Sequence, residues 1–143
     1  MIDTQLLDQW AARAGLAPQC RPEAQMAWGD FEVAFGIREK GDCFEVISVN
    51  RGHWVVDGAT SSRDSAVAML LARFGQLWRS FDGLHDPFPA GRAAGSRVSP
   101  VAEGHLAQVN GEQGVFRREE DARVFTHVAD RPHDDIAALM TTL

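Results

Sequence analysis

The chain has 143 residues, enough for one domain with a single hydrophobic core and too few for an enzyme with a separate cofactor domain. Apolar residues make up 45% and charged residues 24%, a composition typical of a folded rather than a disordered protein. The 20 acidic and 14 basic residues give a formal net charge of -6, which opposes binding to nucleic acid and to anionic lipid.

The N-terminal segment and the cysteines indicate the compartment. The segment MIDTQLLDQW carries acidic residues where a signal peptide carries basic ones. No apolar run approaches the roughly 20 residues that a membrane helix needs. Cys20 and Cys43 lack CxxC spacing, so reduced thiols are expected rather than a disulfide. These features predict a cytoplasmic protein that binds no membrane.

A helix over residues 3–15 opens the predicted fold. Asp3 can cap its N-terminus, and Gly15 followed by Pro18 ends it. The apolar face of this helix consists of Leu6, Leu7, Trp10 and Ala14.

Three or four antiparallel strands are expected next. Phe31, Val33, Phe35 and Ile37 alternate with other residues, which is the period of a strand with one face on a core. The turns EKGD (39–42) and NRGH (50–53) then separate this strand from CFEVISVN (43–50) and WVVDG (54–58).

A second helix is predicted over 62–79, capped by Ser61 or Ser62, with Asp64 in its first turn. Its apolar face should pack across the sheet and place Phe74 and Trp78 in the core.

The glycine- and proline-rich segment 80–96 indicates a connection between two lobes. We therefore expect one domain with a first lobe over about 1–80, a connection over 81–96 and a second lobe over about 97–143. In the second lobe, strands are predicted at 105–110, 114–119 and 123–129, and a last helix at about 132–142. The predicted fold class is α+β, with an antiparallel meander in two sheets or one bent sheet, and with N-terminal, central and C-terminal helices.

No catalytic, cofactor-binding or metal-binding constellation stands out. The five histidines form no HExxH arrangement, and no GxSxG elbow or glycine-rich phosphate loop is present. The carboxylate pairs at 119–120 and 134–135 fit a turn and a helix start better than acid–base catalysis. We expect a protein that is not an enzyme and needs no cofactor.

The segment ARFGQLWRSFDGL (72–84) is similar to one in immunity protein family 61, in which a helix ends in Phe-Gly, three residues, Arg-Ser and a Leu-containing loop. The matching positions are Phe74, Gly75, Arg79, Ser80 and Leu84. Ala14–Gly15, the turn Asn50–Gly52 and the step Thr126–His127 follow the family's order as well. This family includes the immunity factor of the mycobacterial necrotizing toxin, a secreted NAD glycohydrolase.

The resemblance implies a cytoplasmic inhibitor that binds the domain of a cognate toxin, expected to consume NAD, and blocks its active site. The motif itself is expected to be architectural: Gly75 would allow close approach of a neighbour, and Arg79 would cap the carbonyl end of its helix. Toxin contact is predicted at two turns, whose residues are Asn50, Arg51, Gly52 and His53 in the first and Phe81, Asp82 and His85 in the second. The alternative is a secretion chaperone or adaptor that holds a partner segment in an apolar groove.

Overall fold

The computed structural model describes residues 4–142, so the predicted cap at Asp3 lies outside the described residues. Within this range the helices are α1 (Thr4–Arg13), α2 (Arg63–Phe81), α3 (Glu119–Val128) and α4 (His133–Met140). The strands are β1 (Ala17–Gln19), β2 (Met26–Gly29), β3 (Val33–Lys40), β4 (Cys43–Asn50), β5 (His53–Thr60), β6 (Arg97–Val101), β7 (Gly104–Val109) and β8 (Glu112–Phe116). None of these helices is long and apolar enough to cross a membrane.

All the strands join one antiparallel sheet in the order β1-β2-β3-β4-β5-β8-β7-β6. Strands β1 to β5 form a meander from the first half of the chain, and β6 to β8 form a second meander from the last third. The pairing of β5 with β8, from Gly58↔Phe116 to Thr60↔Gly114, joins the two. Of the two arrangements expected, two sheets or one, the chain adopts one.

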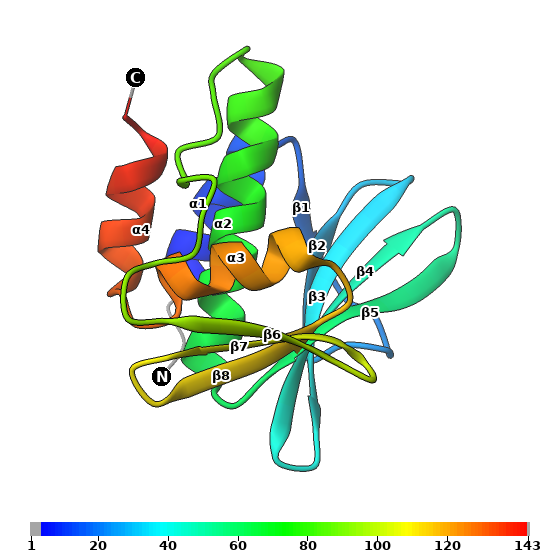
Figure 1. Cartoon of the computed structure of the whole chain (residues 1–143). Helices are drawn as coiled ribbons and strands as arrows, with labels where there is room; N and C mark the ends of the chain where they lie inside the picture. The colour runs from blue at the N-terminus through cyan, green and yellow to red at the C-terminus, as the bar shows by residue number, and fades with distance from the viewer. Residues whose placement is uncertain (1–3, 143) are drawn as a thin grey trace.

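The helices cover one side of this sheet (Figure 1). Helix α2 contacts β3, β4 and β5, whereas α3 contacts β6, β7 and β8; α1 and α4 both pack against α2. Large buried side chains fill the space between the layers: Leu7, Leu70, Leu71, Phe74, Phe116, Phe125, Ile136 and Met140. The predicted α+β fold with N-terminal, central and C-terminal helices is confirmed.

The α2 helix begins as its sequence predicts. Ser62 is the N-cap, and its hydroxyl accepts a hydrogen bond from the backbone N–H of Ser65 at 3.1 Å. The same hydroxyl donates to Glu112 at 2.6 Å, as does that of Ser65 at 2.8 Å. The cap therefore also ties the start of α2 to β8.

The segment 123–129, predicted as a strand, is instead part of helix α3, and that prediction is wrong. Its valines and threonine have high strand propensity, which favours the wrong assignment over so short a stretch. The buried positions Ala122, Val124, Phe125 and Val128 follow the helical period. Glu119, Glu120 and Asp121, expected to form a turn, are the acidic first turn of this helix.

Phe31 is the second error, because it lies outside β3 and 94% of its surface is exposed. The alternation that it shares with Val33, Phe35 and Ile37 ends at Val33, where the chain turns. The short strands β1 and β2 and the edge strand β6 were not predicted. Pro100 is consistent with an edge position for β6, since proline lacks the N–H that an inner strand uses.

Candidate partner-binding site

The predicted contact turn at 50–53 is a two-residue hairpin connection between β4 and β5. Asn50 pairs with His53, and between them Arg51 and Gly52 both have positive φ, at 56° and 81°. This combination defines a turn whose twist matches the flanking strands. Glycine adopts such a backbone freely, but arginine does so rarely. The turn therefore presents the Arg51 side chain from a fixed and unusual backbone position.

A second turn, between β2 and β3, carries Phe31. Here the Asp30 carboxylate accepts hydrogen bonds from the backbone N–H groups of Glu32 at 2.7 Å and Val33 at 2.8 Å. The bond from Val33 and the bond from Glu32 hold the pKa of Asp30 below its ordinary value, because they stabilise the ionised form. The backbone on both sides of Phe31 is thus fixed, while its ring has almost no contact with the rest of the chain.

The sheet register brings these two turns together. Val33, the first residue of β3, pairs with Asn50, the last residue of β4. Both turns therefore lie at the same end of the sheet, on the right of Figure 1. Phe31, Glu32, Asn50, Arg51 and Gly52 line one shallow depression of about 450 Å³. We call residues 30–32 and 50–53 the hairpin tip.

Two charged side chains of the hairpin tip take part in no ion pair. Among residues 4–142, the ion pairs involve neither Arg51 nor Glu32. Arginine is enriched among the residues that dominate binding energy at protein interfaces, and phenylalanine is enriched in interfaces generally. The sequence predicted the turn containing Arg51, but it missed Phe31, whose place beside that turn follows only from the pairing of β3 with β4.

The second predicted contact lies elsewhere, where α2 ends. Phe81 is 68% exposed, and Asp82 and His85 are exposed in the loop that follows. The Asp82 N–H donates to the Trp78 carbonyl at 3.1 Å and so closes the helix. The His85 carbonyl accepts from the Arg79 guanidinium at 2.6 Å, which fixes the loop backbone.

Three of the motif residues, Phe74, Gly75 and Arg79, are buried, whereas Ser80 is exposed. Phe74 is fully buried, with edge-on ring contacts to Trp28 and Phe35. A Cβ atom on Gly75 would lie 2.4 Å from both Cγ and Sδ of Met140, so a side chain here would force Met140 or α4 to shift. The close approach predicted at Gly75 is present.

Arg79 is 4% exposed and caps a different helix from the one expected. Besides the His85 carbonyl, it donates to the Met140 carbonyl at 2.8 Å and to the Thr142 carbonyl, so it caps the C-terminal end of α4. The end of α2 is closed by backbone groups instead: Gly83 N–H bonds to the Ser80 carbonyl, and Leu84 N–H to the Arg79 carbonyl.

The Thr126–His127 step anchors the connection. We call residues 82–96 the strap. The Thr126 hydroxyl accepts from Ala93 N–H at 3.0 Å, and His127 Nε2 lies 2.8 Å from the Gly91 carbonyl oxygen. The His127 ring also stacks on buried Phe88. These contacts hold the strap against α3, so the motif positions fix the architecture around α2, the strap and α4.

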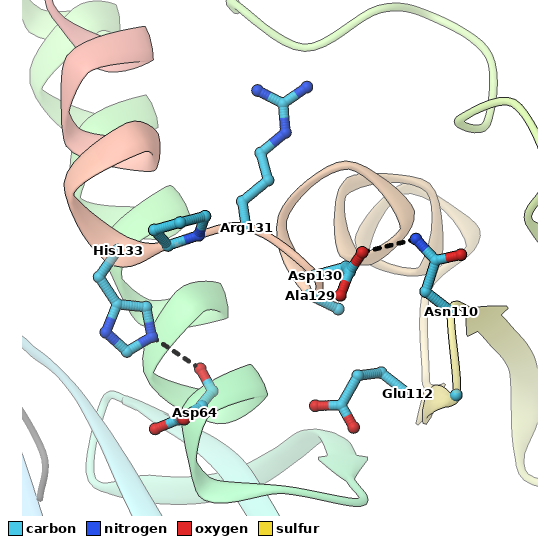
Figure 2. Close-up of a pocket in the computed structure, with 9 residues that line it drawn as sticks. Asp64, Asn110, Glu112, Ala129, Asp130, Arg131 and His133 are labelled. Carbon is cyan, nitrogen blue, oxygen red and sulfur yellow. Dashed lines mark hydrogen bonds between the residues drawn. The ribbon is translucent and has the colours of Figure 1, made fainter.

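Another depression lies at the opposite end of α2 (Figure 2). Several of its polar side chains are bonded to other side chains or to the backbone. Asn110 donates to Asp130 at 2.5 Å, and His133 Nε2 lies 3.1 Å from the Asp64 carbonyl oxygen. Glu112 accepts from Ser62 and Ser65. Across residues 4–142, no group of three or more His, Cys, Asp or Glu side chains could hold a metal ion.

A third depression, lined by Arg73, Arg118 and Glu120 among others, has its charges largely paired. Asp121 accepts from both Arg73 and Arg118. The charge of this carboxylate holds the pKa of Arg118 above its ordinary value. The ion pair between Arg73 and Asp121 joins α2 to α3.

Comparison with known proteins establishes the fold. The structure is similar to that of Rv3902c from M. tuberculosis, with a TM-score of 0.76 and 15% sequence identity, over 99% of this chain and 89% of that one. Neither a protein family nor a curated protein matches the sequence. The likeness to immunity protein family 61 therefore depends on the motifs alone.

Proposed function

We propose that this protein is an immunity protein, which binds a cognate toxin domain and inhibits it by covering its active site. The motif resemblance suggests the class and an NAD-consuming glycohydrolase as the toxin. The observation that carries the proposal is the hairpin tip, where fixed turns present a 94% exposed Phe31 beside an unpaired Arg51.

Inhibition by occlusion makes modest demands on such a protein. It needs a preorganised surface that fits over a cleft, with an interface of roughly 800 Å² on each partner. It needs no nucleophile, metal or cofactor. We accordingly expect the purified protein to hydrolyse no NAD and to bind no zinc.

The adaptor alternative requires a continuous apolar groove. The large hydrophobic side chains exposed among residues 4–142 are Phe31, Val55, Val56 and Phe81. Phe81 lies at the end of α2 and Phe31 at the hairpin tip, so these side chains do not form one groove. The immunity function fits this distribution better, because an inhibitor needs a few anchors rather than a long apolar track.

The test is a titration of the cognate toxin domain, to be sought among the neighbouring genes, with NAD hydrolysis as the readout. We expect activity to fall in proportion to added protein and to vanish at equimolar ratio. Full toxin activity in molar excess of this protein contradicts the proposal. Binding to an unfolded toxin segment without inhibition would favour the adaptor instead.

A further inference from the structure

We propose that the hairpin tip is a plug, with Phe31 inserted into the substrate cleft of the toxin and Arg51 paired with a carboxylate at the rim of that cleft. This inference depends on the proposed function for the identity of the partner. It adds which residues enter the partner and what the receiving site must contain.

The first argument is that the fold gains little from either side chain. Phe31 lies outside the core, and at 94% exposure its ring stabilises no packing within the chain. Arg51 occupies a turn position with φ of 56°, which glycine or asparagine adopts more easily. Phe31 and Arg51 thus add little or nothing to the stability of the isolated chain, and both line one depression.

The second argument is rigidity. Asp30 holds both N–H groups that follow Phe31, and the backbone of Arg51 is set by the pairing of Asn50 with His53. The Val33↔Asn50 pair then connects the two turns through the sheet. Because the backbone on each side is already ordered, inserting the tip loses little conformational entropy.

The shape and charge of the hairpin tip define its partner. Two adjoining turns project from the end of the sheet and suit a concave partner. The receiving site therefore needs an apolar slot for a flat ring and a nearby acidic group for a guanidinium. The nicotinamide ring of the oxidised nucleotide is flat and bears positive charge, so the ring of Phe31 and the guanidinium of Arg51 together resemble that end of the substrate.

A second copy of this chain fits less well. Tip-to-tip pairing about a two-fold axis would place Arg51 near Arg51, where the two like charges repel each other. An anionic membrane is disfavoured by the carboxylates of Asp30 and Glu32 and by the net charge of -6.

The experiment compares Phe31→Ala and Arg51→Ala with wild type, using as the probe the cognate toxin domain, to be sought among the neighbouring genes. Arg131→Ala is the matched control for an exposed arginine, and Glu119→Ala for an exposed carboxylate. We expect Phe31→Ala to weaken toxin binding roughly 30-fold or more and Arg51→Ala about tenfold. Melting temperatures should stay unchanged, so that loss of binding is not loss of folding.

Inhibition kinetics distinguish insertion into the substrate cleft from binding that leaves the cleft open to NAD. Insertion into the substrate cleft predicts that wild-type inhibition is competitive with NAD, and that Phe31→Ala raises the inhibition constant while leaving it competitive. If both tip variants inhibit the toxin as strongly as wild type does, the plug is overturned while the proposed function stands. Noncompetitive inhibition, or a dimer in light scattering that Phe31→Ala dissolves, also overturns it. If wild type does not inhibit at all, the proposed function itself fails.

Discussion

The hairpin tip and the junction of α2 with the strap and α4 use arginine and aromatic side chains in opposite ways. At the junction, Phe74 is buried and Arg79 is committed to backbone carbonyls from two segments. At the tip, Phe31 and Arg51 are exposed, while the backbone beneath them is fixed. Phe74 and Arg79 thus hold the fold together, whereas the side chains of Phe31 and Arg51 are left exposed.

The largest effect should come from Phe74→Ala at the junction. This change removes a fully buried ring that contacts Trp28 and Phe35 edge-on. We expect it to lower the free energy of unfolding by about 3–5 kcal/mol, measured by urea denaturation. An unchanged denaturation midpoint would show that the junction is not the stabilising region.

Arg79→Met should lower the free energy of unfolding by somewhat less than Phe74→Ala does. It keeps most of the side-chain volume but leaves the carbonyls of His85 and Met140 without their charged donor. We expect a loss of about 2–3 kcal/mol in unfolding free energy. Arg131→Met, at an exposed position, is the control and should have little effect. Equal stability of the two variants would contradict the capping role.

Gly75→Ala tests the contact between α2 and α4. The added Cβ would lie 2.4 Å from Met140 Cγ, so α4 or the methionine must shift. We expect a loss of about 1–2 kcal/mol, measured by thermal denaturation. Combining it with Met140→Ala should give less than the sum of the single losses. Strict additivity would mean that the two residues are not in contact.

The turn that carries Phe31 should respond to acid. Because the folded state lowers the pKa of Asp30, this group contributes stability above its ordinary pKa and loses it as the pH falls through the lowered value. In an NMR titration, the Asp30 carboxyl should titrate below an ordinary aspartate, and the Glu32 and Val33 amide signals should shift with it. An ordinary midpoint would mean that the turn is loose.

The smallest effect on stability belongs to the most exposed residue. Phe31→Ala should change the unfolding free energy by less than about 0.5 kcal/mol, since its ring packs against almost nothing. Differential scanning calorimetry of the Phe31→Ala and Phe74→Ala variants compares the two effects directly. A clear destabilisation would place Phe31 in a packing role and weaken its assignment as a plug.

Local patterns predicted the parts of the fold that depend on neighbours in sequence. The hairpins around 41–42 and 51–52, the Ser62 cap and the end of α1 all follow from short-range chemistry. Helix α3 was missed because its residues favour strands individually and the helix is only 10 residues long. The acidic first turn at 119–121 was the signal that could have identified it.

The candidate site was predictable only in part, because its halves come from different turns. Asn50–His53 follow from turn chemistry, whereas Phe31 is joined to them by the register of β3 with β4. The alternation through Phe35 and Ile37 indicated that Phe31 is buried. Instead, the turn held by the Asp30 carboxylate ends the strand at Val33 and leaves Phe31 outside it. Likewise, the contacts of Thr126 and His127 with residues 91–93 depend on the path of the strap, which no sequence period encodes.

The pairing of β5 with β8 has a consequence for how the chain folds. The other strand pairs join neighbours in sequence across short connections, but this pairing brings Thr60 to Gly114 across α2 and the strap. Closing so long a loop costs chain entropy before any contact compensates for it, so we expect this pairing to form later than the local hairpins. The Phe116 ring lies against Gly58, where a Cβ atom would be only 2.2 Å from it. A side chain at position 58 would therefore collide with this ring and weaken the pairing that makes one sheet of two meanders.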